Sequence, residues 1–449
     1  MNKLLRTLIL WPLACSAQDA LSLKDAVRVA LDKNKSVESS AAAGKTATSR
    51  VTEARAGFLP KVDYSESWTR SDNPVFVFSS LLTQHQFGAQ NFQIDPLNRP
   101  DFLNNFQSRI SVEQSLYDGG ATKHKVRSAE LAKDMTGEEG RRTQMEVIAG
   151  AIRCYYDALL SEEQLKAATQ AVRSAQADLD RAQTIRAAGM STDADVLSIR
   201  VHLAGVEEQR IRRAADVDVA GAALNDALGL PLDTAHTLTS MLTPLKLPAQ
   251  TLADQEKSAL SERPEARELG FATSLAANDA AAARGNLLPK VDLHGAFEAD
   301  RQHFYDRGGG NWLVSIDLRW NLFNGFGDKA RIEESQSALH ASEANRDHGV
   351  SAIRLQVRRA FADLHAAEQR IDAAAASVLD AEESLRITQN RYANGYSTVT
   401  DLLRTETAVL EAKTRHLAAI HDQRVAAVML DLASGTLSVD SEVVSEGAR

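Results

Sequence analysis

The second half of the chain repeats the first, and this duplication limits the possible folds more than any other feature. Residues 54–63, ARAGFLPKVD, resemble residues 283–292, ARGNLLPKVD, at an offset of 229. Two later matches, LYDGG at 116–120 with LFNGF at 322–326 and AGMST at 188–192 with NGYST at 394–398, share an offset of 206. Ordered matches of this kind indicate two copies of one structural unit, here 18–245 and 246–449. The change of offset places 23 extra residues in the first copy, between about residues 70 and 106.

Proline is absent from residues 101–230 and from everything after Pro289, so long helices are permitted in both regions. In the second region, apolar residues recur at alternating steps of three and four: Val350, Ile353, Val357, Ala360, Leu364, Ala367, Ile371, Ala374, Val378, Ala381 and Leu385. This heptad pattern is typical of helices packed as coiled coils. It reappears at 147–179 in the first copy, where Cys154 takes a small-residue position and is predicted to be a buried small hydrophobe.

Glycine and threonine mark the ends of these helices. The pattern predicts a helix over 121–187, stopped at Gly189, and a returning helix over 192–228. The second copy predicts an equivalent long helix, stopped at Gly395, and a returning helix over 398–433. Each copy therefore contains a long antiparallel helical hairpin.

Short segments before each helical region alternate apolar and polar residues, as strands with one apolar face do. They lie at 62–68, 110–116, 291–297 and 312–322, and 17 of the 24 aromatic residues fall within 58–117 and 297–326. Their length and aromatic ends suit transmembrane strands, although a soluble sheet with one wet face gives the same alternation. Four strands cannot close a barrel, and an open sheet edge is unfavourable in lipid. A membrane location would therefore require oligomerisation.

Residues 1–17 resemble a secretory signal peptide. Lys3 and Arg6 precede the apolar run LILWPL, and small residues follow at 14–17. Lipidation of Cys15 and an ordinary N-terminal helix are the alternatives, and Pro12 disfavours the lipoprotein signal. If the signal is removed, Cys154 remains without an intrachain disulfide partner.

Composition excludes several classes of protein. After the N-terminus no apolar run reaches the roughly 18 residues of a membrane-spanning helix, which argues against a helical transporter. The formal charge of −9, from 51 basic and 60 acidic residues, argues against nucleic-acid binding. No catalytic constellation, cofactor motif or metal-ligand spacing is present, so we expect no enzyme activity, no cofactor and no metal. The predicted fold is mostly α with β: long coiled-coil hairpins plus four transmembrane strands in each protomer.

The chain resembles the TolC family of outer-membrane efflux and secretion channels. The matching motifs are LSLKDAV at 21–27, FLPKV at 58–62, LYDGG at 116–120, LFNG at 322–325, RYANG at 391–395 and TDLL at 400–403. The resemblance implies a homotrimer with one 12-stranded barrel in outer-membrane lipid, continued by an α-helical tunnel across the periplasm. It also implies a passive, gated exit duct, with porin activity, that meets a periplasmic adaptor (membrane fusion protein) and an inner-membrane pump of RND or ABC type.

The same resemblance assigns candidate functional residues. Asp401 matches an acidic ring at the narrow end of the tunnel, Asp195 is its equivalent in the first copy, and Arg404 stands where some members carry a second aspartate. Thr192-x-x-Asp195 and Thr398-x-x-Asp401 are also capping boxes, so a purely structural role is the alternative. The candidate adaptor-docking tips are Gly189, Ser191, Thr192, Gly395, Ser397 and Thr398, and the candidate pore-lining strand residues are Asp317 and Arg319.

A periplasmic adaptor or scaffold protein, also exported and rich in helical hairpins, is the alternative function. Such a protein would not need two copies of an amphipathic strand pair. The cargo, whether a drug, a metal ion or a polypeptide, is not encoded in any motif of the chain.

Overall fold

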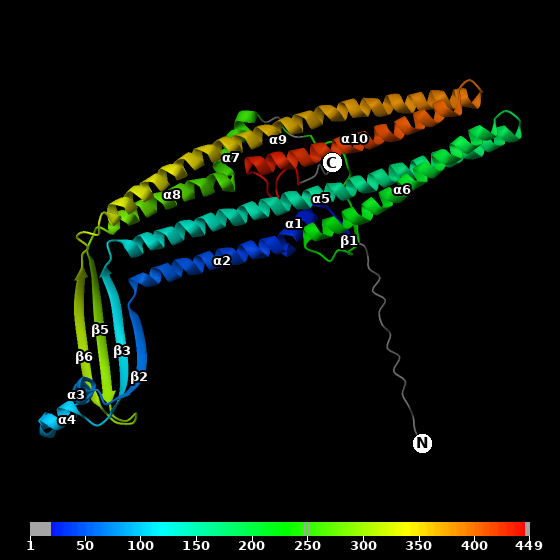
Figure 1. Cartoon of the computed structure of the whole chain (residues 1–449). Helices are drawn as coiled ribbons and strands as arrows, with labels where there is room; N and C mark the ends of the chain where they lie inside the picture. The colour runs from blue at the N-terminus through cyan, green and yellow to red at the C-terminus, as the bar shows by residue number, and fades with distance from the viewer. Residues whose placement is uncertain (1–18, 247, 249–250, 445–449) are drawn as a thin grey trace, which may run out of the picture. The chain divides into compact units, whose positions relative to one another are not determined.

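The computed structural model describes residues 19–246, 248 and 251–444 (Figure 1). The predicted signal peptide and Cys15 lie outside the described residues. The chain divides into two compact units. Of the described residues, the helical unit comprises those up to Ala41, those within Glu139–Arg267 and those from Gly349 to Val444, and the sheet unit comprises Ala42–Glu138 and Glu268–His348.

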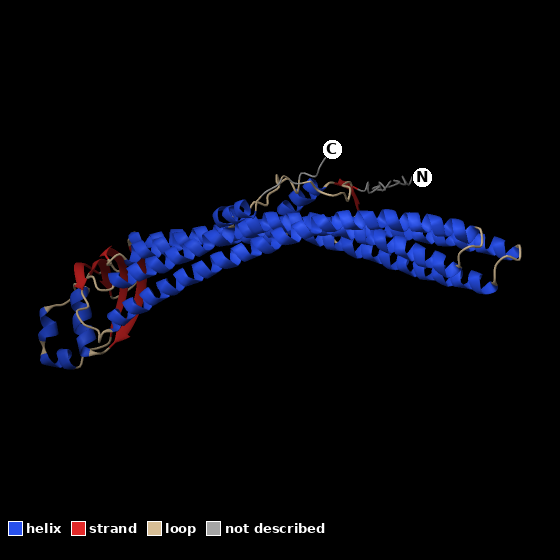
Figure 2. Ribbon diagram, turned by 90° about the horizontal axis from the view of Figure 1, so that it is seen from above, coloured by secondary structure: helices blue, strands red, loops and turns tan. Residues whose placement is uncertain are grey.

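Two helical hairpins dominate the helical unit. The first is α5 (Ala121–Ala187) with α6 (Asp193–Leu228), and the second is α9 (Gly327–Ala393) with α10 (Val399–Ser434). α5 and α9 each have 67 residues, and α6 and α10 each have 36, so the helices of the two copies match without a gap. Within this unit the two hairpins lie side by side (Figures 1 and 2). The predicted hairpins and their ends are confirmed to within one residue.

The predicted heptad seam forms the buried side of the long helices. Its buried members in α9 are Ile353, Val357, Leu364, Ala367 and Ile371, and those in α5 are Ala151, Ala158, Ala168, Ala175 and Leu179. Cys154 packs against the same core, and burial is the main cause that raises the pKa of its thiol. The Cys154 side chain is half-buried, so the predicted contact with the core is confirmed but full burial is not.

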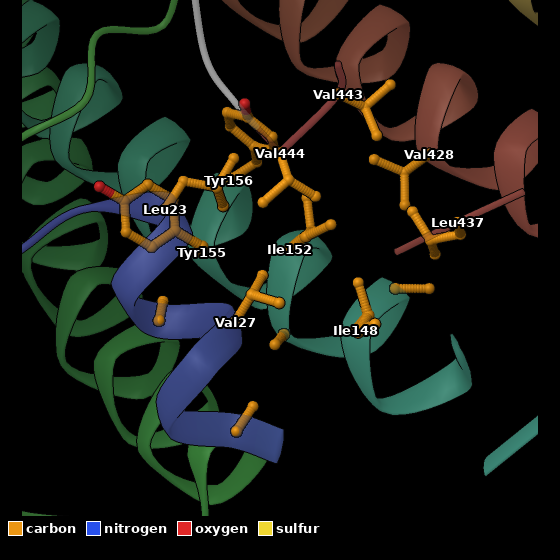
Figure 3. Close-up of a cluster of buried hydrophobic side chains, with 14 of the residues drawn as sticks. Leu23, Val27, Ile148, Ile152, Tyr155, Tyr156, Val428, Leu437, Val443 and Val444 are labelled. Atoms are coloured by element: carbon orange, nitrogen blue, oxygen red, sulfur yellow. The ribbon is translucent and has the colours of Figure 1, made fainter. Parts of the chain in front are cut away.

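The first helix of each copy closes the helical unit at the other end of the hairpins. α1 (Leu23–Lys33) and α7 (Leu252–Glu262) begin at equivalent caps, where the Ser22 and Thr251 hydroxyls accept from Asp25 N–H and Asp254 N–H. Leu23 and Val27 of α1 pack on α5 in the main core (Figure 3). There the Tyr155 hydroxyl donates to the Leu21 carbonyl at 2.9 Å, which fastens the short parallel pair β1 (Asp19–Leu21) and β4 (His236–Leu238).

Two glycines end the returning helices in the same way. Gly229 after α6 has φ +71° and Gly435 after α10 has φ +77°, a backbone conformation that side chains with a Cβ rarely adopt. A Cβ on Gly229 would lie 2.5 Å from the Lys33 carbonyl oxygen, and one on Gly435 would lie 2.6 Å from the Arg263 nitrogen. Both contacts involve backbone, so each glycine is required by conformation and by space.

The sheet unit contains four antiparallel strands in the order β2-β3-β5-β6 (Figure 1). They are β2 (Lys61–Ser71), β3 (Leu103–Tyr117), β5 (Lys290–Arg301) and β6 (Gly309–Arg319), and they confirm the four predicted strand segments. The prediction for the last strand, 312–322, began three residues after the observed start and ended three residues after the observed end. Trp320 lies beyond the ladder, where its indole N–H donates to the Leu287 carbonyl at 3.0 Å.

Helices α2 (Lys35–Arg55) and α8 (Pro264–Gly285) precede β2 and β5. Their first residues are also 229 positions apart, so the duplication includes the helices before the strands. The 23 extra residues of the first copy lie in the connection from β2 to β3. This connection forms α3 (Pro74–Thr83), η2 (Ala89–Phe92) and α4 (Ile94–Asn98). The Gln84 amide fastens it to the sheet through the Asn104 carbonyl at 2.9 Å and the Asn105 side chain at 2.8 Å. Among the described residues, none of the helices is both long and apolar enough to cross a bilayer.

Candidate functional site

Each hairpin turns through a glycine that needs a left-handed backbone. Gly189 has φ +75° and Gly395 has φ +76°, and a Cβ on either would meet no atom within 4 Å. In both turns the next residue donates back to the helix: Met190 N–H to the Ile185 carbonyl at 3.0 Å and Tyr396 N–H to the Arg391 carbonyl at 2.8 Å. This pattern is a Schellman motif. The glycines therefore serve the turn, and the space around them is open.

The two candidate aspartates form the same capping box in both copies. One oxygen of Asp195 accepts from the Thr192 N–H at 3.1 Å, the Thr192 hydroxyl at 2.8 Å and the Ser191 hydroxyl at 3.1 Å. Asp401 makes the same three contacts, at the same distances, with Thr398 and Ser397. The structure thus contains the capping geometry that the sequence indicated.

These hydrogen bonds keep both carboxylates ionised. Donation from the backbone N–H and hydroxyl of Thr192 lowers the pKa of Asp195, and donation from the hydroxyl and N–H of Thr398 lowers the pKa of Asp401. Arg404 is exposed, and no ion pair joins it to Asp401 in the described part of the chain. Asp401 is instead engaged by its own capping box.

The predicted tip residues lie in or beside the two turns that join the hairpin helices: Gly189, Ser191, Thr192, Gly395, Ser397 and Thr398. The predicted aperture residues Asp195 and Asp401 lie in the first turns of α6 and α10, and Arg404 lies further along α10. Sequence reasoning missed one further pair at equivalent positions. Met190 and Tyr396 are 74% and 76% exposed, so each turn presents a large apolar side chain to solvent. Their position directly after a turn glycine was the signal that could have identified them.

One face of the sheet is charged. The strand register places Asp317 and Arg319 on this face, opposite Asp292 and Lys290 of β5. Arg319 pairs with Asp292 at 3.0 Å, and His294 lies 3.6 Å from Asp317. Further charged residues of this face are Arg109, Glu113 and Glu298. Both predicted strand residues are therefore on the polar face and belong to a network of charges.

The opposite face of the sheet is mostly apolar and exposed, apart from an ion pair of 3.1 Å between Glu66 and Arg301. Its large side chains are Val62, Tyr64, Trp68, Ile110, Phe297, Trp312, Val314, Ile316 and Leu318, and all are more than 40% exposed in the single chain. Isolated soluble proteins rarely expose an apolar surface of this extent. The alternation of an apolar and a charged face along strands of 11–15 residues matches the pattern of transmembrane barrel strands.

The profile of the family described as "Outer membrane efflux protein" matches residues 26–230 and 257–436. The chain belongs to this family. The two matched segments follow the two copies of the duplication.

Relatives and solved structures of the outer membrane efflux protein family show the same likeness. The Bordetella pertussis protein CyaE is 26% identical, over 75% of this chain and 72% of its own. The Pseudomonas aeruginosa alkaline protease secretion protein AprF is 25% identical, over 95% of this chain and 87% of its own. The structure of the Campylobacter jejuni CmeC outer membrane channel has a TM-score of 0.78 at 15% identity, over 94% and 88% of the two chains, which shows a shared fold.

Membership of the outer membrane efflux protein family confirms the predicted family, the location in the outer membrane and the role as a channel for efflux or secretion. It decides between the predicted channel and the alternative periplasmic adaptor in favour of the channel. Among the described residues, no group of three histidine, cysteine or acidic side chains is arranged to hold a metal ion.

Proposed function

We propose that three copies of this chain form one passive, gated exit duct through the outer membrane, without enzyme activity. The observation that carries this proposal is the open, four-stranded sheet with an exposed apolar face. Each neighbouring pair of strands is antiparallel, so the edge strands β2 and β6 also run in opposite directions. β6 of one copy can therefore pair with β2 of the next without breaking the antiparallel pattern.

Closing the sheet removes the unpaired edges, which is the condition for a sheet in lipid. Three sheets of four strands give a barrel with an even number of strands, as bacterial outer-membrane barrels have. In that barrel the apolar face would contact lipid, and Asp317 and Arg319 would line the pore. The helical hairpins of the three copies would form the tunnel on the periplasmic side.

The hairpin tips are the proposed contact with a periplasmic adaptor, which in turn would connect an inner-membrane pump of RND or ABC type. The exposed Met190 and Tyr396 beside Gly189 and Gly395 provide apolar contact area, and the capping boxes keep the tips in one conformation. Relatives are named for the secretion of alkaline protease and for efflux pumps. Energy and cargo selection would belong to the pump.

Membrane fractionation and unheated gel electrophoresis test the assembly. We expect a detergent-extracted outer-membrane species that migrates as a trimer unheated and as a monomer of 48.8 kDa, less any removed signal, after boiling. Closed barrels resist detergent because all their backbone groups are paired, so heating is needed to separate the copies. A soluble periplasmic monomer would exclude the proposed duct.

Conductance in planar bilayers tests Asp401 as a gate residue. Asp401→Asn removes the charge and keeps an oxygen that can accept at the cap, whereas Thr398→Ala removes the cap hydroxyl, at a typical cost of about 1 kcal/mol, and keeps the charge. If three carboxylates surround the aperture, Asp401→Asn should lower cation selectivity and Thr398→Ala should not. Equal selectivity in the wild type and Asp401→Asn would show that Asp401 acts only as a cap.

A further inference from the structure

Two buried carboxyl groups and an imidazole meet where the two hairpins pack together. The carboxyl cluster consists of Asp178 on α5, His202 on α6 and Glu406 on α10. Asp178 is only 3% exposed, and the Glu406 side chain is 8% exposed. His202 Nε2 lies 3.3 Å from one Glu406 oxygen, an ion pair when the imidazole is protonated. The cluster therefore joins both helices of the first hairpin to the second hairpin.

This cluster lacks hydrogen-bond donors. Arg181, on the same helix as Asp178, reaches one of its oxygens at 3.4 Å. The other oxygen of Asp178 and both oxygens of Glu406 are buried and have no hydrogen-bond partner among the described residues, apart from the ion pair that a protonated His202 would make with Glu406. Two ionised carboxylates here would be acceptors only and would repel each other. A single proton between them supplies the missing donor and removes one charge.

We propose that a proton shared by Asp178 and Glu406 latches the two hairpins together, and that its loss loosens the hairpin tips. The latch concerns packing within the helical unit, and only its effect on the aperture rests on the proposed function. A cavity of about 500 Å³ beside the cluster is lined by residues of all four hairpin helices, including His202 and Glu406. Water in this cavity can solvate the carboxylates once they are both charged, which favours separation.

Burial and the neighbouring carboxyl raise the pKa of Asp178, whereas the charge of Arg181 lowers it and so opposes them. Burial, followed by the hydrogen bond and the charge of Glu406, raises the pKa of Asp178 to about 8. The pKa of Glu406 is lowered in spite of burial by the hydrogen bonds from His202 and Asp178, so the shared proton lies mainly on Asp178. The remaining neighbours are Arg181 from α5, Tyr392 from α9, and the Glu382–Lys413 ion pair, 2.7 Å long, between α9 and α10.

The raised pKa of Asp178 determines whether the latch is stronger in acid or in base. Packed hairpins keep a proton that separated hairpins would release between about pH 4, the ordinary range of an aspartate, and about pH 8. The latch is therefore fully formed in acid and is lost as the pH rises through about 8. Asp195 and Asp401 do not titrate in this window, because their pKa values are lowered.

Spin-label distances between the tips test the latch. Met190→Cys and Tyr396→Cys, in a Cys154→Ser background, place one label on each exposed turn, and labelled chains are diluted with unlabelled ones. With otherwise native residues we expect the distance to lengthen and broaden between pH 5 and pH 9, with a midpoint near pH 8. Asp178→Asn, which keeps an N–H donor toward Glu406, should retain the acid distance at both pH values.

Two further variants make the result decisive. Glu406→Gln supplies the donor from the other side and should also abolish the pH response. Asp431→Asn changes a half-buried carboxyl outside the cluster whose pKa is also raised, to about 6, and should keep the response. An unchanged distance between pH 5 and pH 9, or an equal shift in Asp178→Asn, would overturn the latch. A normal distance response with constant bilayer conductance would support the latch and contradict its proposed effect on the aperture.

Discussion

Val314→Arg should abolish the heat-sensitive trimer in the outer membrane, whereas Ser315→Arg should preserve it. Val314 lies at the centre of β6 on the apolar face and is 61% exposed in the single chain. Arginine on the lipid side of a barrel costs about 2–4 kcal/mol at the bilayer midplane. A trimer carries this cost three times. Ser315 is the next residue and faces the polar side, opposite His294.

The measurement is the amount of trimer in outer-membrane fractions on unheated gels, normalised to total protein. Because the two variants add the same charge to adjacent residues of one strand, a general effect of arginine on folding would affect both. Equal loss of trimer in Val314→Arg and Ser315→Arg would contradict the assignment of the apolar face to lipid. Equal tolerance of both changes would contradict the barrel itself.

Gly435→Ala should destabilise the protein more than alanine at either of two other glycines. At φ +77° an L-residue costs roughly 1–2 kcal/mol, and the new Cβ would also lie 2.6 Å from the Arg263 backbone nitrogen. Gly395→Ala carries the same conformational cost, at φ +76°, but meets no neighbouring atom. Gly221→Ala, within helix α6, should stabilise the protein by about 0.5–1 kcal/mol.

Melting temperatures of the three variants in detergent, followed by circular dichroism at 222 nm, check this order. The comparison separates two effects, since Gly395→Ala measures conformation alone and Gly435→Ala adds the clash at the α7–α8 junction. Similar melting temperatures for these two variants would show that the junction can move away from the new side chain at little cost.

The hairpins were predictable because their rules are local. A proline-free region, a heptad seam and a glycine followed by Ser-Thr-x-x-Asp are each visible within short stretches of sequence, and they located α5, α6 and α10 to within a residue. The connection from β2 to β3 was recognised as an insertion, but its helices were not predicted. They are started by local chemistry that was overlooked: the Asn73 side chain caps α3, and Pro74 occupies the first turn.

The features that the sequence did not predict depend on contacts between distant parts of the chain. β1 and β4 have three residues each and pair across more than 200 positions. Strands this short show no periodic pattern in the sequence. Asp178, His202 and Glu406 occupy ordinary positions on long helices, where a charged residue usually indicates a solvated face. Only the packing of the hairpins shows that these three side chains are buried against each other. The capping role of Asp195 and Asp401 was visible from sequence, whereas their role at an aperture remains a prediction.

The equal lengths of the paired helices have a consequence for how this chain can change over generations. Removing one heptad from α9 alone would shorten that helix by about 10 Å at 1.5 Å per residue, while α5 kept its length. One turn would then be displaced relative to the other along the hairpins. A partner that contacts both turns would lose its contact with one of them. We therefore expect insertions and deletions to be tolerated only when the lengths of all four hairpin helices change by the same amount.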